Sequence, residues 1–387
     1  MTIRRIALRG LPRLVLLALL ACGLAGCERP EEPAARGGPG SDRGAGSDRA
    51  PGSDRAVVLL YHHVATDTPA STSISPAKFA AHLQYLSDHG YQVVPLSRLI
   101  DALVQRQPLP DRAVAITFDD AYRSVFTHAH PELQRRGMPY AVFVSTDYLD
   151  QGSSHYMSWE QLRALEAAGA EIGNHSRSHA HYLHRPAAES TRAWRQRIAD
   201  DIRGAQARLQ AEIERPLAAL AYPYGEFDPA LQAIAADLGM VGFGQQSGPL
   251  GPASDLQGLP RYPMAGSYAG LDDLAQKLRT RPFDVRVLKG DQPVLTPDAA
   301  APRLRLQLEA PGARLEALSC FVSGQEPPEL VWVDPSRGVL EITAQRPLPV
   351  GRSKYTCTAP AHDDGSAFYW YSHLWMKPPA AGEWYRD

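Results

Sequence analysis

The sequence begins without a long, continuous run of apolar residues. Residues 14–21 are apolar, whereas a helix that spans a membrane takes about 20 such residues. Arg4, Arg5, Arg9 and Arg13 precede this run. A short apolar run behind basic residues is typical of an export signal and not of a membrane span. We therefore expect the first residues to be removed on export and to lie outside the fold.

Cysteine is also scarce, since the chain of 387 residues contains four. Cys22 lies within the export signal and Cys27 directly behind it, so the folded part keeps Cys320 and Cys357. This number excludes a small scaffold held together by many disulfides. An exported protein meets an oxidising environment, so we predict that the remaining pair is bridged. Closing a loop of this size would stabilise the fold by about 4 kcal/mol.

Neither sign of charge is in large excess, because 40 basic and 42 acidic residues leave a net charge of -2. Loss of the four arginines of the export signal would change this value to -6. No Lys/Arg-rich segment occurs in the rest of the sequence, so nucleic acid is not an expected partner. Hydrophobic residues make up 44% of the chain, as in a globular protein with a full core.

The end of the export signal reads Leu24-Ala25-Gly26-Cys27, which resembles the lipobox of bacterial lipoproteins. The resemblance implies that residues 1–26 are a lipoprotein signal peptide and that Cys27 is lipidated. A plain secretory signal that contains Cys27 is the alternative. Glu28 follows the cysteine, and by resemblance to Gram-negative lipoproteins this favours a lipid anchor at the periplasmic face of the outer membrane.

Three regions follow the predicted signal. Residues 27–55 are mainly Pro, Gly, Ala and charged residues, and Gly-Ser-Asp-Arg begins at Gly40, Gly46 and Gly52. This composition predicts a flexible linker. We predict one domain at residues 56–285 and a second, smaller domain at residues 286–387.

The first predicted domain alternates apolar runs with helical patterns. The runs lie at residues 57–61, 113–118, 138–144, 170–173, 218–222, 241–243 and 259–264. Continuous apolar runs indicate strands that are covered on both faces, as in a parallel sheet. The pattern therefore predicts an α/β fold, a distorted (β/α)7-type barrel.

The second predicted domain has a different sequence pattern. Its residues alternate between polar and apolar, as in Arg303-Leu304-Arg305-Leu306-Gln307-Leu308, and prolines are frequent. This alternation predicts a small antiparallel, β-sandwich-like accessory domain that the predicted disulfide crosslinks.

Two acidic and two basic side chains follow predicted strands of the first domain. Asp119 and Asp120 end the run at residues 113–118, and His175 and His179 follow the run at residues 170–173. Parallel α/β folds place their sites at the carboxyl ends of strands. One carboxylate and two imidazoles can hold a catalytic divalent metal, and the second carboxylate can take a proton from water. The pattern predicts hydrolysis.

These motifs resemble those of the polysaccharide deacetylases of carbohydrate esterase family 4, which share a nodulation-type deacetylase domain. Thr117-Phe118-Asp119-Asp120 matches the first family motif, and His175-Ser176 with His179 matches the second. The resemblance implies that Asp119 is the general base and that Asp120, His175 and His179 bind one divalent metal ion. Zinc is favoured, and cobalt, nickel or iron also accept such ligands.

The third family motif is altered here, since it reads Ala221-Tyr222-Pro223-Tyr224-Gly225. The resemblance implies that the backbone N–H of Tyr224 stabilises the oxyanion. The arginine that orients the general base in much of the family is missing from this motif. Leu259-Pro260-Arg261 stands where the late Leu-x-His motif would carry the general acid, so that acid is not identified. His181 and His184 are candidates only because they are close in sequence.

Further residues are expected near the substrate. His62 and His63 end the first predicted strand, and with Tyr222 and His181 they form our wider set of substrate-binding candidates. A structural hydrogen-bonding role is an equal alternative for the two neighbouring histidines. The opening Leu60-Tyr61-His62-His63-Val64 and the Tyr-Pro-Tyr-Gly variant look most like exported poly-N-acetylglucosamine deacetylases.

The resemblance implies an N-deacetylase acting on a β-linked N-acetylglucosamine polysaccharide, with the glycan synthesis or export machinery as a further partner. Peptidoglycan, chitin and acetylxylan are alternative substrates of the same chemistry. Two histidines and one carboxylate also make the site of a non-haem iron oxygenase, but Asp119 has no role there. A catalytically weak polysaccharide-binding lipoprotein is the alternative from another class.

Overall fold

The computed structural model describes residue 53, residues 55–186 and residues 188–380. The predicted signal peptide, the predicted lipidation site Cys27 and nearly all of the predicted linker lie outside these residues. Within the described ranges, no helix combines the length and the apolar character that crossing a membrane would require.

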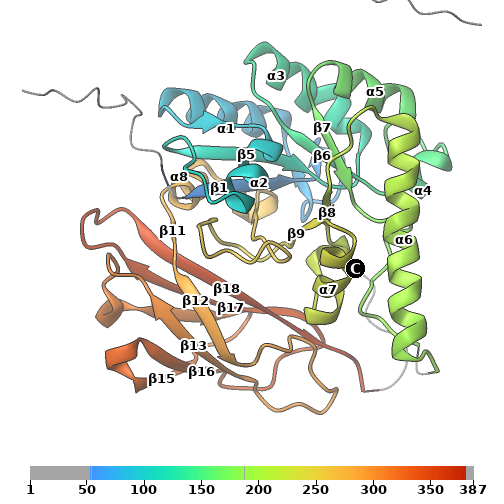
Figure 1. The fold of residues 1–387 in the computed structure, drawn as a ribbon. Helices are drawn as coiled ribbons and strands as arrows, with labels where there is room; N and C mark the ends of the chain where they lie inside the picture. The colour runs from blue at the N-terminus through green and yellow to red at the C-terminus, as the bar shows by residue number, and fades with distance from the viewer. Residues whose placement is uncertain (1–52, 54, 187, 381–387) are drawn as a thin grey trace, which may run out of the picture. The chain divides into compact units, whose positions relative to one another are not determined.

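A parallel sheet organises the first domain (Figure 1). Its strands follow the order β10-β1-β5-β6-β7-β8-β9, and β4 pairs with β5. They are β1 (Ala56–Tyr61), β4 (Gln92–Val93), β5 (Ala113–Phe118), β6 (Ala141–Val144), β7 (Glu171–Asn174), β8 (Ala219–Ala221), β9 (Val241–Phe243) and β10 (Tyr262–Pro263). The seven strands of the main path form a half-barrel, so the predicted (β/α)7-type fold is confirmed. The short β2 (His63–Val64) and β3 (Ser73–Ile74) pair separately.

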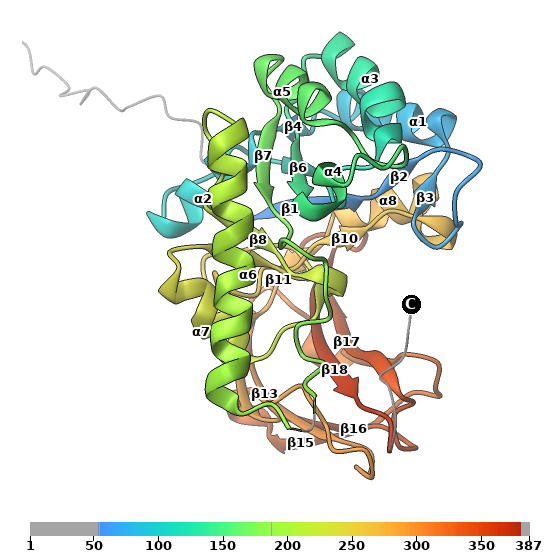
Figure 2. The same ribbon diagram turned by 90° about the vertical axis from the view of Figure 1, so that its right-hand side faces the viewer.

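Helices cover this sheet (Figures 1 and 2). In the described residues they are α1 (Pro76–Asp88), α2 (Leu96–Val104), α3 (His130–Arg135), α4 (Thr146–Asp150), α5 (Trp159–Ala167), α6 (Thr191–Glu212), α7 (Pro229–Asp237) and α8 (Leu271–Leu278). Several starts are encoded locally, because Ser75, Ser158, Ser190 and Asp228 each accept a hydrogen bond from a backbone N–H of the first turn.

The long central strands β1, β5 and β6 are mainly apolar because both faces of the sheet are buried there. All six residues of β1 are buried. Val57 and Leu59 point into the core that contains α1, whereas Ala56 and Val58 point into the core on the other face. This alternation follows from the strand period of two residues. The carboxyl edge of the sheet is therefore the place where polar side chains can gather.

The second domain consists of two four-stranded sheets with the orders β11-β18-β17-β14 and β12-β13-β16-β15. The strands are β11 (Arg281–Pro282), β12 (Asp284–Lys289), β13 (Arg303–Glu309), β14 (Ser319–Val322), β15 (Glu329–Asp334), β16 (Val339–Thr343), β17 (Gly351–Pro360) and β18 (Phe368–Lys377). All pairs are antiparallel except the short pair β11–β18. Leu304, Leu306 and Leu308 of β13 point into a core that both sheets share. The predicted antiparallel β structure of the C-terminal region is confirmed.

The predicted disulfide is present. Cys320 on β14 and Cys357 on β17 are directly opposite each other in the sheet and are bridged. Both residues are buried in the core of this domain. The bridge therefore joins two strands whose cysteines are 37 residues apart in the chain.

Replacing both Cys320 and Cys357 by alanine is expected to lower the free energy of unfolding by about 4 kcal/mol, because the unfolded chain gains the freedom of an open loop. Urea unfolding followed by circular dichroism measures this difference. The reduced wild-type protein is the control and should resemble the variant. A difference within about 0.5 kcal/mol, the size of an ordinary surface substitution, would contradict the expectation.

Candidate metal centre

The carboxyl ends of β5 and β7 bring the predicted metal ligands together. Asp120 follows β5, and His175 and His179 follow β7. The Oδ1 atom of Asp120 lies 3.2 Å from Nε2 of His175 and 3.1 Å from Nε2 of His179. The three ligand atoms thus meet at one point. The fold produces this convergence because parallel strands end at the same edge of the sheet.

The chemistry of these atoms fits a divalent metal ion. Among the described residues, neither Asp120 Oδ1 nor His175 Nε2 has a hydrogen-bond partner, although both atoms are buried. His175 donates its Nδ1–H to the carbonyl oxygen of Ala221 at 2.7 Å. This bond leaves the lone pair of Nε2 free to point at the cluster, as the outer hydrogen bond of a metal-ligating histidine does. One carboxylate oxygen and two imidazole nitrogens are a usual ligand set for a catalytic site.

Asp119 is held by an arginine that the sequence motifs did not reveal. The Arg261 guanidinium donates to both carboxylate oxygens of Asp119, at 2.7 and 2.8 Å, and its Nε donates to the carbonyl oxygen of Gly244 at 2.9 Å. Both charged side chains are fully buried. The expectation that Asp119 lacks an orienting arginine is therefore wrong. An arginine inside the otherwise apolar run at residues 259–264 was the available signal, because a buried arginine needs a carboxylate.

The arginine also controls the charge of Asp119. Burial by itself raises the pKa of this carboxyl, but the Arg261 guanidinium, its hydrogen bonds and the nearby His175 outweigh burial and hold the pKa below its usual range. Asp119 is therefore ionised at neutral pH. Its Oδ2 atom lies 4.0 Å from His175 Nε2, so the carboxylate is adjacent to the ligand cluster but turned toward Arg261.

Strained backbone is concentrated around the cluster. Five of the seven non-glycine residues with positive φ in the described part of the chain lie in the motif segments or directly behind one: Asp120, Ala121, Ser176, His179 and Tyr224. A left-handed conformation costs about 1–2 kcal/mol for a residue with a side chain. Such strain persists only where the surrounding structure imposes it, and it is characteristic of functional sites.

The two tyrosines of the third motif have different surroundings. The ring of Tyr224 lies 4.6 Å from the ring of His179, between centroids, so this residue borders the cluster. Tyr222 is fully buried, and its hydroxyl donates to the carbonyl oxygen of Gln257 at 2.7 Å. Tyr222 thus belongs to the core and does not face a substrate. The wider set of substrate-binding candidates is corrected at this position.

His181 and His184 form a second cluster with Glu226. The Nδ1 atom of His181 is 3.0 Å from Oε2 of Glu226, and His184 Nε2 is 3.9 Å from the same oxygen. The ring of His181 stacks on that of Tyr224 with centroids 3.6 Å apart. Both candidate acids therefore contact a buried carboxylate on the far side of Tyr224.

The two histidines after β1 lie close to the ligand cluster. Burial lowers the pKa of His62, and the carboxylates of Asp120 and Asp119 act against this shift. His63 stacks on Tyr122 with ring centroids 3.5 Å apart, and burial lowers its pKa to about 4. Both rings are accordingly neutral at pH 7. Asp120 is an electrostatic neighbour of both, whereas Asp119 and His175 act on His62.

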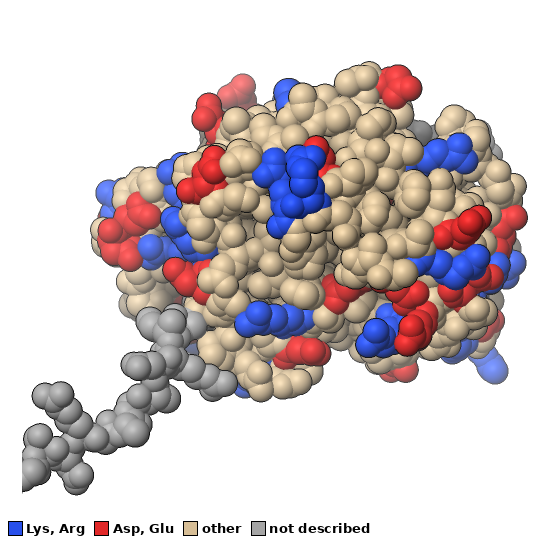
Figure 3. Space-filling model, turned by 90° about the horizontal axis from the view of Figure 1, so that it is seen from above, with Lys and Arg blue, Asp and Glu red and all other residues tan. Residues whose placement is uncertain are grey.

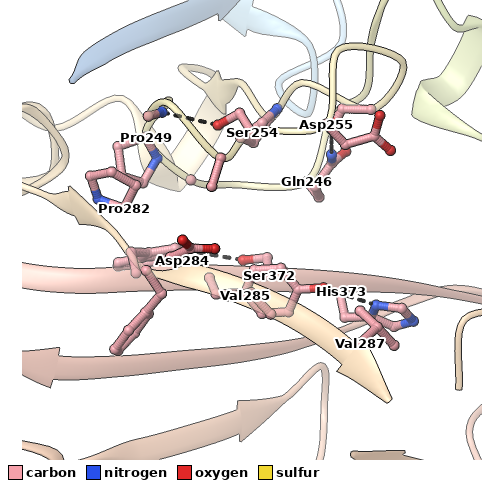
Figure 4. Close-up of a pocket in the computed structure, with 18 of the residues that line it drawn as sticks. Gln246, Pro249, Ser254, Asp255, Pro282, Asp284, Val285, Val287, Ser372 and His373 are labelled. Atoms are coloured by element: carbon pink, nitrogen blue, oxygen red, sulfur yellow. Dashed lines mark hydrogen bonds between the residues drawn. The ribbon is translucent and has the colours of Figure 1, made fainter. Parts of the chain in front are cut away.

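A cavity of about 670 Å³ lies apart from this cluster, between barrel loops and strands of the second domain (Figure 4). Its lining includes Gln246, Asp255, Asp284, Ser372 and His373. None of the predicted metal ligands, which all belong to the described residues, lines this cavity. The predicted metal centre is thus separate from this cavity.

Charged groups of both signs are interspersed on the face that Figure 3 shows from above, among wide areas that carry neither. A surface of this kind does not present one continuous field to a ligand. Recognition on this face would therefore depend on hydrogen bonds and ring contacts more than on net charge.

Comparisons with known proteins agree with the geometry. Residues 106–243 match the family described as polysaccharide deacetylase. The chain is 24% identical over 259 residues to the poly-beta-1,6-N-acetyl-D-glucosamine N-deacetylase of Escherichia coli (strain K12), covering 58% of this chain and 38% of that protein. It is 25% identical over 225 residues to the protein of the same name from Staphylococcus epidermidis, and the match covers 53% of this chain and 78% of that protein. The chain spans only 38–42% of the length of three curated relatives.

Solved structures share the half-barrel. IcaB from Ammonifex degensii superposes with a TM-score of 0.52 at 28% identity, covering 59% of this chain and 98% of that chain. The Streptococcus pyogenes deacetylase PplD, solved in complex with acetate, gives a TM-score of 0.52 at 21% identity. This match covers 58% of this chain and 98% of that chain. The second likeness concerns the fold alone. The matched portion is close in size to the parallel domain.

Replacing Arg261 by methionine is expected to lower the free energy of unfolding by about 3–5 kcal/mol at pH 7, because the buried carboxylate of Asp119 loses its partner. The pKa of Asp119 then rises, so the folded variant takes up a proton as the pH falls. The difference in the free energy of unfolding between variant and wild type should therefore become smaller as the pH is lowered toward about 4. Urea unfolding at several pH values measures it.

The double variant Asp119→Asn/Arg261→Met is the control for this prediction. Removing both charges is expected to be close to neutral for stability, since no unpaired charge stays buried. Equal losses of stability in the single and double variants, or a loss that is independent of pH, would contradict the assigned pairing.

Proposed function

Because the chain carries a polysaccharide deacetylase domain, as its motifs predict, we propose that it is a metal-dependent N-deacetylase of a β-linked N-acetylglucosamine polysaccharide. Poly-N-acetylglucosamine is the favoured substrate, which the names of the E. coli and S. epidermidis relatives support. One observation carries the proposal. A buried carboxylate, Asp119, is fixed by Arg261 beside a separate three-ligand cluster of Asp120, His175 and His179.

The proposed reaction assigns one task to each group. A divalent ion held by Asp120, His175 and His179 would polarise the acetyl carbonyl and make bound water more acidic. Asp119 takes the proton from the water that attacks the carbonyl carbon. The backbone N–H of Tyr224 donates to the oxygen on which negative charge develops. The C–N bond then breaks, acetate leaves, and the nitrogen takes up a proton to become a free amine.

Zinc is the proposed ion, because it prefers an open tetrahedral site with nitrogen and oxygen ligands. Cobalt, nickel and iron accept the same donors. Metal analysis of protein purified without added ions, followed by chelation and reloading with each ion in turn, separates these choices. Loss of acetate release on chelation and its return with zinc is the expected result.

The geometry favours catalysis over the two alternatives from other classes. A polysaccharide-binding lipoprotein has no need of an ionised, bidentately held carboxylate next to a metal site. In a non-haem iron oxygenase, Asp119 and Arg261 would likewise have no task. Peptidoglycan, chitin and acetylxylan require the same chemistry and differ from the favoured glycan in linkage or acetylated group. An acetate assay across these glycans distinguishes them.

Replacing Asp119 by asparagine is expected to reduce acetate release from acetylated glucosamine oligomers by about 100-fold to 10,000-fold, because the proton acceptor is lost. The metal content should stay at the wild-type level, since the three ligands are unchanged. An enzymatic acetate assay and metal analysis on the same preparation provide both values. In the matched variant His175→Ala, metal and activity should be lost together. Undiminished acetate release in Asp119→Asn would contradict the proposed mechanism.

We further propose that Cys27 carries a lipid that anchors the protein at the periplasmic face of the outer membrane, where it can meet a glycan in export and its synthesis machinery. The lipobox-like Leu24-Ala25-Gly26-Cys27 supports this proposal. Cys27→Ser is expected to move the protein from the membrane fraction to the soluble periplasmic fraction and to abolish labelling by a palmitate analogue. Retention of both properties would contradict the anchor.

A further inference from the structure

One strand of the second domain reaches the predicted catalytic edge of the first. Arg352 of β17 donates from Nη1 to the carbonyl oxygen of Tyr224 at 2.9 Å, and Lys354 donates from Nζ to the carbonyl oxygen of Gln245 at 3.1 Å. The two cations are two residues apart, so they leave the same face of the strand. Tyr224 follows β8 and Gln245 follows β9. Strand β17 thus holds the ends of two neighbouring barrel strands.

Arg352 also belongs to the charge network around Tyr224. Its guanidinium carbon lies 5.5 Å from the centre of the Tyr224 ring, and its Nη1 lies 3.8 Å from Oε1 of Glu226. Glu226 is fully buried and accepts from His181, whose ring stacks on Tyr224. The ring of Tyr224 is therefore in contact with His181, Arg352 and the metal-ligand candidate His179.

The conformation of Tyr224 explains why such support is needed. Its φ of 58° and ψ of 5° place a bulky residue in the left-handed region. Gly225 follows with a φ of 70° and packs so tightly that a Cβ atom there would come within 2.6 Å of Gln245 Cβ. If Tyr224 relaxed to a negative φ, the peptide groups on either side would rotate. Its N–H would then turn away from the predicted oxyanion position.

A second metal ion in the cluster of His181, His184 and Glu226 is the competing explanation. The two imidazole rings are nearly parallel, with an interplanar angle of 4° and centroids 4.1 Å apart. Ring nitrogens carry their lone pairs in the ring plane, so parallel rings do not aim them at a common point. The Arg352 guanidinium beside Glu226 also places a positive charge where a cation would bind. The geometry therefore favours a support for Tyr224 over a metal site.

We propose that Arg352 is a positioning residue for deacetylation, through which the second domain holds Tyr224 in the left-handed conformation that presents its backbone N–H to the reaction. The inference rests on the proposed function, in which this N–H binds the developing oxyanion. The C-terminal domain is thereby a part of the catalytic apparatus and not an independent module.

Replacing Arg352 by methionine tests the proposal with little change in side-chain length. We expect kcat for acetate release to fall by about 10-fold to 100-fold, the size of a small misplacement of a catalytic group. KM should change by less than about twofold, because the lost contact acts on the transition state. Arg352→Lys keeps the charge and one donor, so it should recover part of kcat. Arg305→Met, which removes an arginine paired with Glu341 in the same domain, is the matched control with wild-type kinetics.

A glycine at position 224 separates positioning from general stability. Glycine adopts positive φ without strain, so in the background of Tyr224→Gly the change Arg352→Met should reduce kcat by a clearly smaller factor than it does in the wild type. Equal factors in the two backgrounds would overturn the proposal.

Hydrogen exchange gives a readout that does not depend on activity. In Arg352→Met, the amides of Tyr222 and of residues 224–227 should exchange at least about tenfold faster, because the turn loses its outer support, while metal content stays unchanged. If the wild type releases no acetate from any glycan but exchange accelerates, the proposed function fails and the support of Tyr224 by Arg352 stands. If the wild type is active and Arg352→Met changes neither kcat nor exchange, the positioning role of Arg352 is refuted while the proposed function stands.

Discussion

The buried ion pair between Asp119 and Arg261 is the interaction on which the rest of the site depends. A carboxylate without water is unfavourable unless a cation and hydrogen bonds replace its hydration. Arg261 provides both, and it also binds the carbonyl oxygen of Gly244 at the end of β9. The pair therefore joins the ends of three strands, β5, β9 and β10, around one charge. Asp119 stays ionised and is kept out of the ligand cluster, which leaves it available to accept a proton.

The same edge of the sheet stores backbone strain. Asp120, Ser176, His179 and Tyr224 all adopt left-handed conformations, which locally disfavour the native state. The continuous apolar strands that precede these residues supply the packing that imposes such conformations. The rigid half-barrel and the strained turns are thus two parts of one arrangement, because side chains can be aimed at a common point only from a scaffold that does not yield.

The second domain extends this arrangement. Its disulfide between Cys320 and Cys357 crosslinks β14 to β17, and β17 is the strand that carries Arg352 and Lys354. A strand crosslinked to its neighbour and embedded in its own core can hold two barrel carbonyl groups in fixed positions. The stability of the β domain and the geometry of the Tyr224 turn are physically connected for this reason.

The sequence by itself determined the features that depend on local order. The apolar runs that end in Asp119-Asp120 and in the histidine motif predicted the strands and the ligand set. Residues that directly follow parallel strands lie at the carboxyl edge of the sheet, so the runs also predicted where these side chains meet. Only the tertiary structure decided which distant groups complete the site. Arg261 is 142 residues from Asp119, and Arg352 is 128 residues from Tyr224. Such pairs depend on how the half-barrel curves and how the second domain packs, and no local pattern encodes either.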